Sequence, residues 1–162
     1  ERMANAYMAL HDAGEHDAAS RAQALIQGLG FKTTELNKPV NSFSGGWRMR
    51  LQLARALMCP TELLLLDEPF AAVDEFTRES LNDDLLAMFA AARFSAIFVT
   101  HSISEAVYLS QRVIIMSPRP GSIAHEIQIP FEYPRKPELR YSAEFAKCCG
   151  HIAALMKEMQ TV

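Results

Sequence analysis

Residues 63–69 read Leu-Leu-Leu-Leu-Asp-Glu-Pro, and this stretch decides the fold. Four consecutive apolar residues without polar alternation predict a short strand that is covered on both faces, as in a parallel sheet. The strand ends in Asp67 and Glu68, at the place where open α/β sheets bind their ligands. A first carboxylate there can hold Mg²⁺, and a second can orient or deprotonate a water molecule. Taken alone, the pair is also explained as a polar turn after a buried strand.

Around this stretch, helical and strand patterns alternate along the chain. The predicted helices are residues 3–29 in two parts (the second beginning near Asp17), 44–58, 75–92 and one that begins at Ser102. The further predicted strands are residues 95–100, 112–116 and an edge strand over 122–129. This order predicts an α/β fold with a parallel sheet. A proline-containing loop then leads into one or two amphipathic helices over residues 138–160.

Composition excludes some classes of protein. The 162 residues are 49% hydrophobic and 22% charged with a net charge of −3, which is ordinary for a globular domain and gives no basic footprint for nucleic acid. No apolar run approaches the roughly 20 residues of a membrane span. The three cysteines have no metal-binding spacing and are interpreted as reduced thiols. The chain begins at Glu1 without an initiator Met, from which we expect a piece of a longer chain.

Two other motifs carry chemistry that suits a phosphate. Ser44, Gly45 and Gly46 open a predicted helix, where backbone N–H groups and the helix dipole favour an anion. His101 follows directly after the predicted strand 95–100, so it can face the same crevice as Glu68. Taken alone, the Ser-Gly-Gly turn is better explained as a helix cap with flexible glycines, and the lone histidine as a satisfied residue in a loop.

The motifs in combination strongly resemble the ATP-binding-cassette family. They occur in order as Phe-Ser-Gly-Gly-Trp at 43–47, Leu-Leu-Leu-Leu-Asp-Glu-Pro at 63–69, Ala-Ala-Val-Asp at 71–74 and Val-Thr-His-Ser at 99–102. The resemblance covers at least residues 31–129. It implies a P-loop NTPase-like three-layer parallel sheet that lacks its first half and carries C-terminal helices. The implied domains are a partial nucleotide-binding domain over 1–130 (1–60 and 61–130) and a helical extension over 131–162.

In that family the first motif is the signature loop. The resemblance implies that Ser44, Gly45 and Gly46 bind the γ-phosphate of an ATP held by the opposite subunit. Trp47 would belong to the same site, although transporters commonly carry Gln at this position. Its ring would cover the nucleotide or simply pack.

The other motifs would act on their own side of the nucleotide. By resemblance, Asp67 supports Mg²⁺, Glu68 is the general base and His101 contacts the γ-phosphate. Asp74, in the D-loop, would link the two sites of a head-to-tail dimer. The implied cofactors are therefore ATP and Mg²⁺.

The sequence departs from the family pattern in two ways. The 162 residues contain no G-x-x-x-x-G-K-[ST] phosphate loop, so we expect weak or absent ATP binding and no hydrolysis by the chain alone. In addition, residues 1–69 resemble the ribosome-associated, transporter-free ABC-F type, whereas residues 70–162 resemble nitrate, sulfonate and taurine importer ATPases. A chimera joined near residues 67–69 accounts for both halves. A divergent natural member and a convergent signature region are the alternatives.

The resemblance implies an ATPase subunit of an importer of the nitrate, sulfonate or taurine type. Its partners would be a second ATPase subunit and a membrane permease, with no nucleic acid, and it would lie in the cytoplasm at the inner face of the membrane. A translation-associated ATPase and a non-catalytic fragment that packs or dimerises are the alternatives. The C-terminal apolar positions Phe145, Leu155 and Met159 are interpreted as core or dimer packing.

Overall fold

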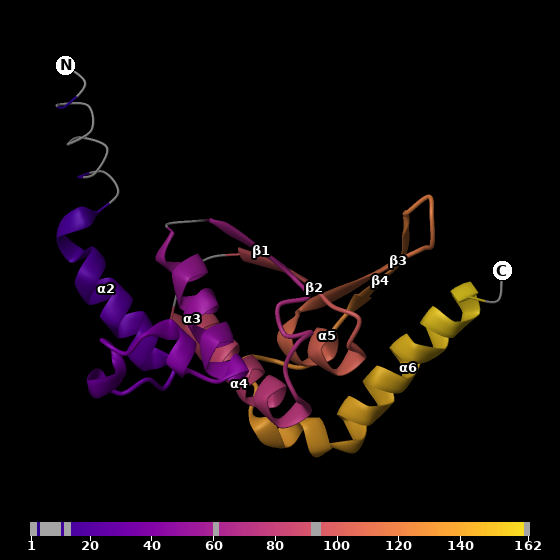
Figure 1. Cartoon of the computed structure of the whole chain (residues 1–162). Coiled ribbons are helices and arrows are strands. Elements are labelled where there is room, and N and C mark those ends of the chain that lie inside the picture. Colours follow the sequence, from indigo (N-terminus) through magenta and orange to yellow (C-terminus); the bar gives the residue numbers. More distant parts are fainter. Residues whose placement is uncertain (1–2, 4–10, 12–13, 60–61, 92–94, 161–162) are drawn as a thin grey trace. The chain divides into compact units, whose positions relative to one another are not determined.

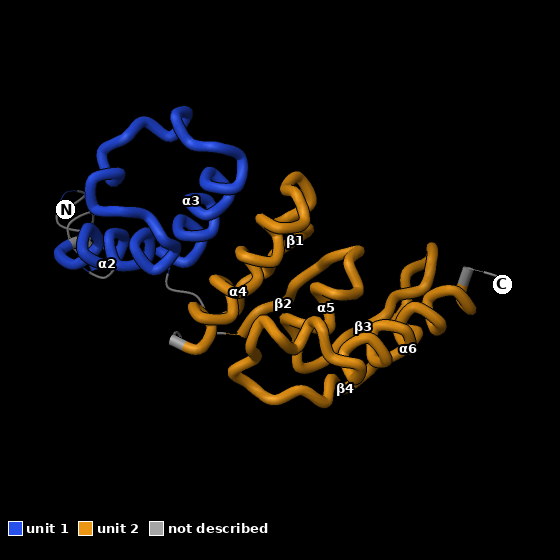
Figure 2. The backbone as a smooth tube through the Cα atoms, turned by 90° about the horizontal axis from the view of Figure 1, so that it is seen from below, with its two compact units in different colours: residues 1–62 blue, residues 63–162 orange. Residues whose placement is uncertain are grey.

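The computed structural model describes residues 3, 11, 14–59, 62–91 and 95–160. Their elements, in chain order, are drawn in Figure 1. The chain divides into two compact units, residues 1–62 and residues 63–162, which Figure 2 shows in different colours. Each unit has internal contacts of its own.

The described residues of the first unit form two α-helices and two short 3-10 turns, Thr33–Glu35 and Val40–Ser42. Helix α2 spans Glu15–Gly28, and helix α3 spans Gly45–Met58 and packs against it. Gly30 has φ 89°, a backbone conformation that glycine adopts without steric cost, and it ends α2 as predicted. The predicted second helix is thus confirmed. The helix predicted before it falls mostly on residues outside the described part of the chain.

An aromatic cluster connects the loop between the two helices to the start of α3. The ring of Phe31 lies 5.3 Å from that of Phe43 and 4.6 Å from that of Trp47, both edge to face. The guanidinium of Arg50 lies over the Trp47 ring at 5.0 Å and donates to the carbonyl of Leu29 at 2.8 Å. Aromatic pairs of this kind contribute about 1 kcal/mol beyond their buried area. The cluster therefore holds the loop that enters the signature motif.

The described residues of the second unit form four strands in two small sheets. Strand β1 (Leu63–Asp67) pairs in parallel with β2 (Ser95–Val99). Strand β3 (Arg112–Met116) pairs antiparallel with β4 (Ile123–Gln128). The α/β class and all four predicted strands are confirmed. In the described residues, however, the strands do not join into the single parallel sheet that their order predicts.

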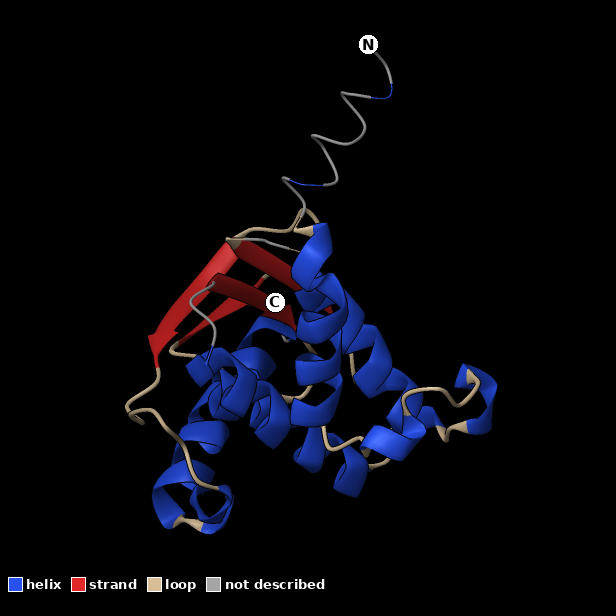
Figure 3. Ribbon diagram, turned by 90° about the vertical axis from the view of Figure 1, so that its left-hand side faces the viewer, coloured by secondary structure: helices blue, strands red, loops and turns tan. Residues whose placement is uncertain are grey.

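The prediction that β1 is covered on both faces is wrong for the described residues. Leu63 and Leu65 are 54% and 64% exposed, and Ile97 and Val99 on β2 are 52% and 44% exposed. We call these four side chains the open sheet face. On the opposite face Leu66 is buried, because the described helices of the second unit lie on that side of the strands (Figures 1 and 3).

Three helices form the core of the second unit. They are α4 (Glu75–Ala91), α5 (Ile103–Leu109) and α6 (Ala143–Gln160). Helix α5 packs against both α4 and α6. Leu81, Leu85 and Met88 are buried as predicted, whereas Phe89 is half-buried. The predicted C-terminal helical region is one 3-10 turn, Pro137–Tyr141, followed by the single helix α6.

The residues between β4 and α6 hold α5 in place through a buried arginine. Arg135 is 7% exposed and donates to the carbonyls of Val107 and Tyr108 at 2.8 and 2.7 Å, at the C-terminal end of α5. It also donates to the carbonyl of Phe131 from two nitrogens, at 3.2 and 2.8 Å. A cation at a helix C-terminus is favourable, and the last carbonyls of the helix need such partners. Arg135 therefore fastens the tail onto α5.

Candidate active site

Glu68 and His101 follow the two strands of the parallel pair. Asp67 lies opposite Val99 in the register, so the two strands end side by side. The Glu68 amide donates to the Val99 carbonyl at 2.9 Å, which continues the ladder by one residue. The Glu68 Oε1 atom then lies 3.1 Å from Nδ1 of His101. The structure thus brings together the carboxylate and the histidine that the sequence predicts for one crevice.

Glu68 has an unusual backbone conformation. Its φ is 43°, in the left-handed region that residues with a side chain seldom adopt. Such a conformation costs about 1 kcal/mol or more and is found preferentially at functional sites. The turn that follows is closed by the Ala71 amide, which donates to the Glu68 carbonyl at 3.2 Å. The turn therefore places the Glu68 side chain beside the end of β2, where His101 lies.

A small cavity opens beside this pair. Its volume is about 10 Å³, and its lining includes Glu68, His101, Thr100 and Phe70. A cavity of about this size holds one water molecule. Both side chains of the pair are partly exposed, at 49% for Glu68 and 70% for His101, so larger groups can reach them from solvent. The geometry suits a water molecule held between a carboxylate and an imidazole.

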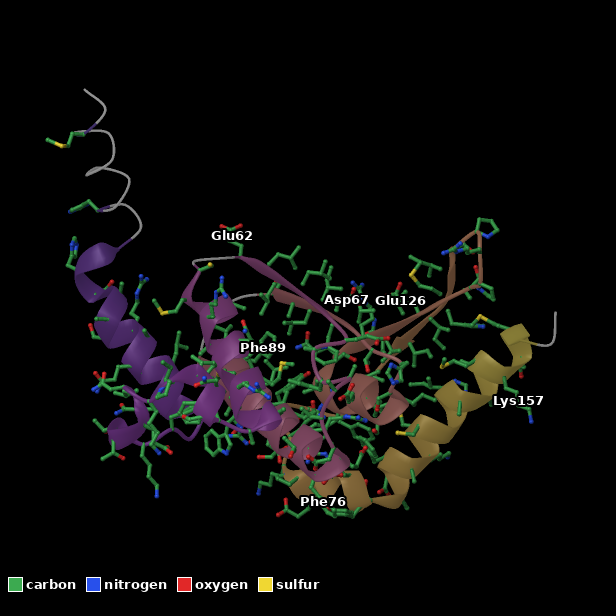
Figure 4. All side chains as sticks on the ribbon, in the orientation of Figure 1. Glu62, Asp67, Phe76, Phe89, Glu126 and Lys157 are labelled. Carbon is green, nitrogen blue, oxygen red and sulfur yellow. The ribbon has the colours of Figure 1, made fainter. Side chains whose placement is uncertain are left out.

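Asp67 is the last residue of β1 and is exposed (Figure 4). In the described residues, no group of three or more His, Cys, Asp or Glu side chains is placed to hold a metal ion. Mg²⁺ is commonly held by one or two carboxylates together with substrate phosphates and water, so a complete protein cage is not required. The donor set at the end of β1 fits a metal ion that arrives with a nucleotide.

Thr100 and Ser102 fix the backbone on either side of His101. The Ser102 amide donates to the Thr100 hydroxyl at 3.0 Å, and the Glu105 amide donates to the Ser102 hydroxyl at 3.4 Å. Ser102 is thus the predicted N-cap of α5. The Glu105 carboxylate, which a capping box would place on the Ser102 amide, instead accepts from the Thr100 hydroxyl. The Thr100 hydroxyl therefore connects the Glu105 carboxylate to the Ser102 amide and so restrains the backbone around His101.

Asp74, predicted for the D-loop, precedes helix α4. Its Oδ1 accepts from the Thr77 amide at 3.0 Å, and its Oδ2 accepts from the Thr77 hydroxyl at 2.6 Å. These bonds lower the pKa of Asp74, because they favour the ionised carboxylate. The side chain thus has a structural role as the helix cap, which the sequence interpretation had not assigned to it.

We expect the cap to make stability depend on pH. Because the folded-state pKa of Asp74 is depressed, its contribution is present above the unfolded value near 3.8 and is lost as pH falls through the lower folded value. Asn caps a helix without a charge, so wild type should unfold at a higher temperature than Asp74→Asn at pH 7. Thermal unfolding from pH 7 to 2.5 measures the difference, which should narrow as the pH falls below 3.8. A constant difference would contradict this.

The signature residues belong to the first unit. Ser44 precedes α3, and its carbonyl accepts from the Arg48 amide at 2.9 Å. Among the described residues its hydroxyl makes no capping bond, and open space surrounds Gly45. Gly46 follows in the first turn, so the amides at this helix start can approach an anion. Trp47 is 36% exposed and packs on Phe31, which places it in the aromatic cluster of this unit.

Sequence reasoning missed two residues beside the site. Arg78 and Glu105 line the same small cavity as Glu68 and His101. Glu105 is 5% exposed, which is rare for a carboxylate without compensation. The only sequence signal for Glu105 was its spacing from Ser102, and none marked Arg78.

Comparisons with known proteins agree with these motifs. Residues 3–71 match the sequence model of the ABC transporter family. An ATP-binding protein of Brucella abortus is 45% identical over 65% of this chain and 40% of its own length. An ABC transporter ATP-binding protein of Methanocaldococcus jannaschii is 39% identical over 85% of this chain and 50% of its own length. The aliphatic sulfonates import ATP-binding protein of Bacillus cereus is 49% identical over 57% of this chain and 37% of its own length.

Solved structures show the same fold. A bacterial ABC transporter cassette solved as a dimer is 26% identical, with a TM-score of 0.55 over 70% of this chain and 47% of its own. That cassette is also known in a post-hydrolysis state bound to ADP and phosphate. The cbiO1 protein of Clostridium perfringens, part of the cbiONQ ABC transporter complex, has a TM-score of 0.63 over 88% of this chain and 55% of its own, at 21% identity.

The fold, the paired strand-end residues and these matches define the class of protein. Over the matched residues the chain resembles the ATP-binding-cassette ATPases, a family that includes a cassette solved in a post-hydrolysis state. The relatives include an ABC transporter ATP-binding protein and an aliphatic sulfonates import ATP-binding protein. The chain spans less than half of the length of the Brucella and Bacillus relatives. No helix in the described residues is long and apolar enough to cross a membrane.

Proposed function

We propose that this chain supplies the general base, the phosphate-contacting histidine and the signature loop of an ATP-hydrolysing cassette. The observation that carries the proposal is the Glu68–His101 pair, 3.1 Å apart, beside a cavity of about 10 Å³. A general base must lie within hydrogen-bond reach of the proton that it accepts. A water molecule in that cavity meets this requirement for Glu68.

The two side chains would divide the chemistry between them. The Glu68 carboxylate would accept the proton of the attacking water as the water oxygen adds to the γ-phosphorus and the bond to the β–γ bridging oxygen breaks, so that ADP leaves with that oxygen. An imidazolium at His101 would donate from Nδ1 to Glu68 and from Nε2 to a phosphate oxygen, because both ring nitrogens then carry hydrogens. Positioning and electrostatic stabilisation account for most of the catalysis in phosphoryl transfer. The fixed backbone around His101 serves this purpose.

Asp67 and the signature loop would complete the nucleotide site. Asp67 would hold Mg²⁺, which neutralises charge on the phosphates, with phosphate oxygens and water as the other ligands. Ser44 and the amides of Gly45 and Gly46 would bind the γ-phosphate of an ATP held by a second ATPase subunit. The open space at the start of α3 supports this role. Asp74 would lie where the two subunits meet.

The open sheet face indicates that another part of the cassette packs against the second unit. Parallel sheets are almost always covered on both faces, and Leu63, Leu65, Ile97 and Val99 are exposed here. We infer that the part of the cassette carrying the phosphate loop covers these side chains. The same part would hold the β- and γ-phosphates, which no motif within the 162 residues is suited to do.

For the intact protein we propose an importer ATPase. The resemblance of residues 70–162 to nitrate, sulfonate and taurine importers, and the similarity to a sulfonate import protein, support this. In this proposal the chain is a partial nucleotide-binding domain over 1–130 with a helical extension over 131–162. It would act with a membrane permease at the inner face of the cell membrane. Uptake of labelled sulfonate, nitrate or taurine by vesicles containing the reconstituted transporter tests the solute class.

A binding measurement tests whether ATP binding requires the cassette half that carries the phosphate loop. We expect the 162-residue chain alone to bind a fluorescent ATP analogue weakly, with a Kd above about 1 mM. A joined cassette, in which an N-terminal cassette half carrying G-x-x-x-x-G-K-[ST] precedes this chain, should bind at least about 100-fold more tightly. Equilibrium fluorescence titration measures both. Tight binding by the chain alone would contradict the proposal.

A further inference from the structure

Arg78, on the first turn of α4, has no place in the proposed chemistry. Its side chain is only 21% exposed, although it carries a charge. One terminal nitrogen donates to the Val73 carbonyl at 3.1 Å, and the other donates to Glu75 Oε2 at 3.2 Å. The guanidinium therefore grips the backbone of the residue that directly precedes Asp74.

The third nitrogen of the same guanidinium faces Glu105. Arg78 Nε lies 3.6 Å from Glu105 Oε1, an ion pair that is longer than a hydrogen bond. A buried carboxylate is costly unless a cation or hydrogen bonds compensate it. The second oxygen of Glu105 accepts from the Thr100 hydroxyl, so Arg78 and Thr100 share the compensation.

Thr100 connects Glu105 to residues 100–102, which we call the His101 loop. Its hydroxyl donates to Glu105 and accepts from the Ser102 amide at 3.0 Å. Residues 100 and 102 flank His101, so one hydroxyl fixes the backbone on both sides of the imidazole. A continuous chain of contacts thus runs from the Val73 carbonyl, through Arg78, Glu105 and Thr100, to the His101 loop.

We propose that the Arg78–Glu105 pair is a positioning link between the loop that carries Asp74 and the loop that carries His101. The proposal rests on the proposed function, in which Asp74 faces a second subunit and His101 contacts phosphate. The link acts through backbone positions, because neither Arg78 nor Glu105 bonds to the imidazole. A displacement of residues 73–74 by the second subunit then changes the placement of His101. Supporting residues of this kind hold reacting groups in productive geometry.

Amide hydrogen exchange in the 162-residue chain tests the link without ATP. Arg78→Met removes the charge and the bond to Val73 and nearly preserves side-chain length. We expect the Ser102 and Glu105 amides to exchange about 10-fold faster, while the Leu85 amide in the middle of α4 is unchanged. Arg78→Lys keeps the charge, so it should give a smaller increase and should fold where Arg78→Met does not.

Arg140→Met is the matched control. Arg140 also binds α4, through Asp83 at 2.8 Å and the Glu79 carbonyl at 3.1 Å, and its guanidinium lies over the Tyr108 ring of α5 at 3.5 Å. Among the described residues, no hydrogen bond or ion pair joins Arg140 to residues 100–102. Arg140→Met should leave Ser102 exchange unchanged relative to Leu85. The double variant Arg78→Met with Glu105→Gln should exchange no faster at Ser102 than Arg78→Met, since both changes break one path. Unchanged Ser102 exchange in Arg78→Met and Arg78→Lys, or equal acceleration in Arg140→Met, overturns the link.

ATP turnover by the joined cassette separates this inference from the proposed function. Arg78→Met should lower kcat about 10-fold or more and leave the Kd for ATP within twofold, because the pair touches no nucleotide group. Arg78→Lys should recover part of the loss. A selective exchange response together with a joined cassette that never hydrolyses ATP would support the link and reject the function. Normal kcat in Arg78→Met together with unchanged exchange would reject the link alone.

Discussion

Glu68→Gln in the joined cassette should keep ATP binding and lose hydrolysis by about 100-fold or more, the usual contribution of a general base. Gln preserves the shape of Glu68 and can still bond to Nδ1 of His101, but it cannot accept the proton of the attacking water. The strained backbone at φ 43° should persist, because the substitution is isosteric. Phosphate release measured under saturating ATP gives the loss directly.

The control for this experiment is Glu62→Gln, in the same cassette. Glu62 is an exposed carboxylate just before β1, at the opposite end of that strand from Glu68 (Figure 4). It should leave kcat within about twofold, since it is remote from the strand end where the reaction is proposed. Hydrolysis that survives in Glu68→Gln would remove Glu68 from the role of base.

Arg135→Met should give the largest loss of stability of any single substitution considered. Arg135 makes four hydrogen bonds to three backbone carbonyls, and its guanidinium lies over the Tyr133 ring, 4.3 Å from the ring centroid. Burial lowers the pKa of its guanidinium, yet the carbonyls at the end of α5 favour the charged form. Its removal leaves buried acceptors without donors, and we expect the free energy of unfolding to fall by about 3 kcal/mol or more.

Urea unfolding followed by circular dichroism measures this effect. Arg119→Met is the matched control, because Arg119 is exposed in the turn between β3 and β4 and should change stability by less than about 0.5 kcal/mol. Arg135→Lys should fall between the two, since a lysine reaches fewer carbonyls than the planar fork of an arginine. A loss below about 1 kcal/mol for Arg135→Met would show that the tail does not fasten α5.

The local elements could be predicted because their signals are local. The apolar run 63–66 predicts a strand, and the structure has β1 over Leu63–Asp67. A helix was predicted to begin at Ser102, and Ser102 is the N-cap of α5. The covering of β1 could not be predicted, since an apolar side chain states only that it favours burial. Which part of a protein buries Leu65 depends on contacts that lie outside its own sequence neighbourhood.

The candidate site was predictable to a similar extent. Glu68 and His101 were expected to meet because parallel strands end at the same edge, and they lie 3.1 Å apart. The pairing of Arg78 with Glu105 joins residues 27 positions apart, and no spacing rule marks it. The cap formed by Asp74 had a visible signal, a threonine three residues later, which was overlooked beside the family motif. The Asp74 cap is therefore visible in the sequence, whereas the pairing of Arg78 with Glu105 becomes visible only in the folded structure.

In the proposed function, this chain supplies the hydrolytic residues of a cassette, and the residues that hold the β- and γ-phosphates come from another part of it. The decisive measurement is Mg²⁺-dependent ATP turnover by the chain alone and by the joined cassette under identical conditions. We predict no turnover above background for the chain alone and sustained turnover for the joined cassette. Turnover by the chain alone, or none by a joined cassette that binds ATP tightly, would contradict the claim.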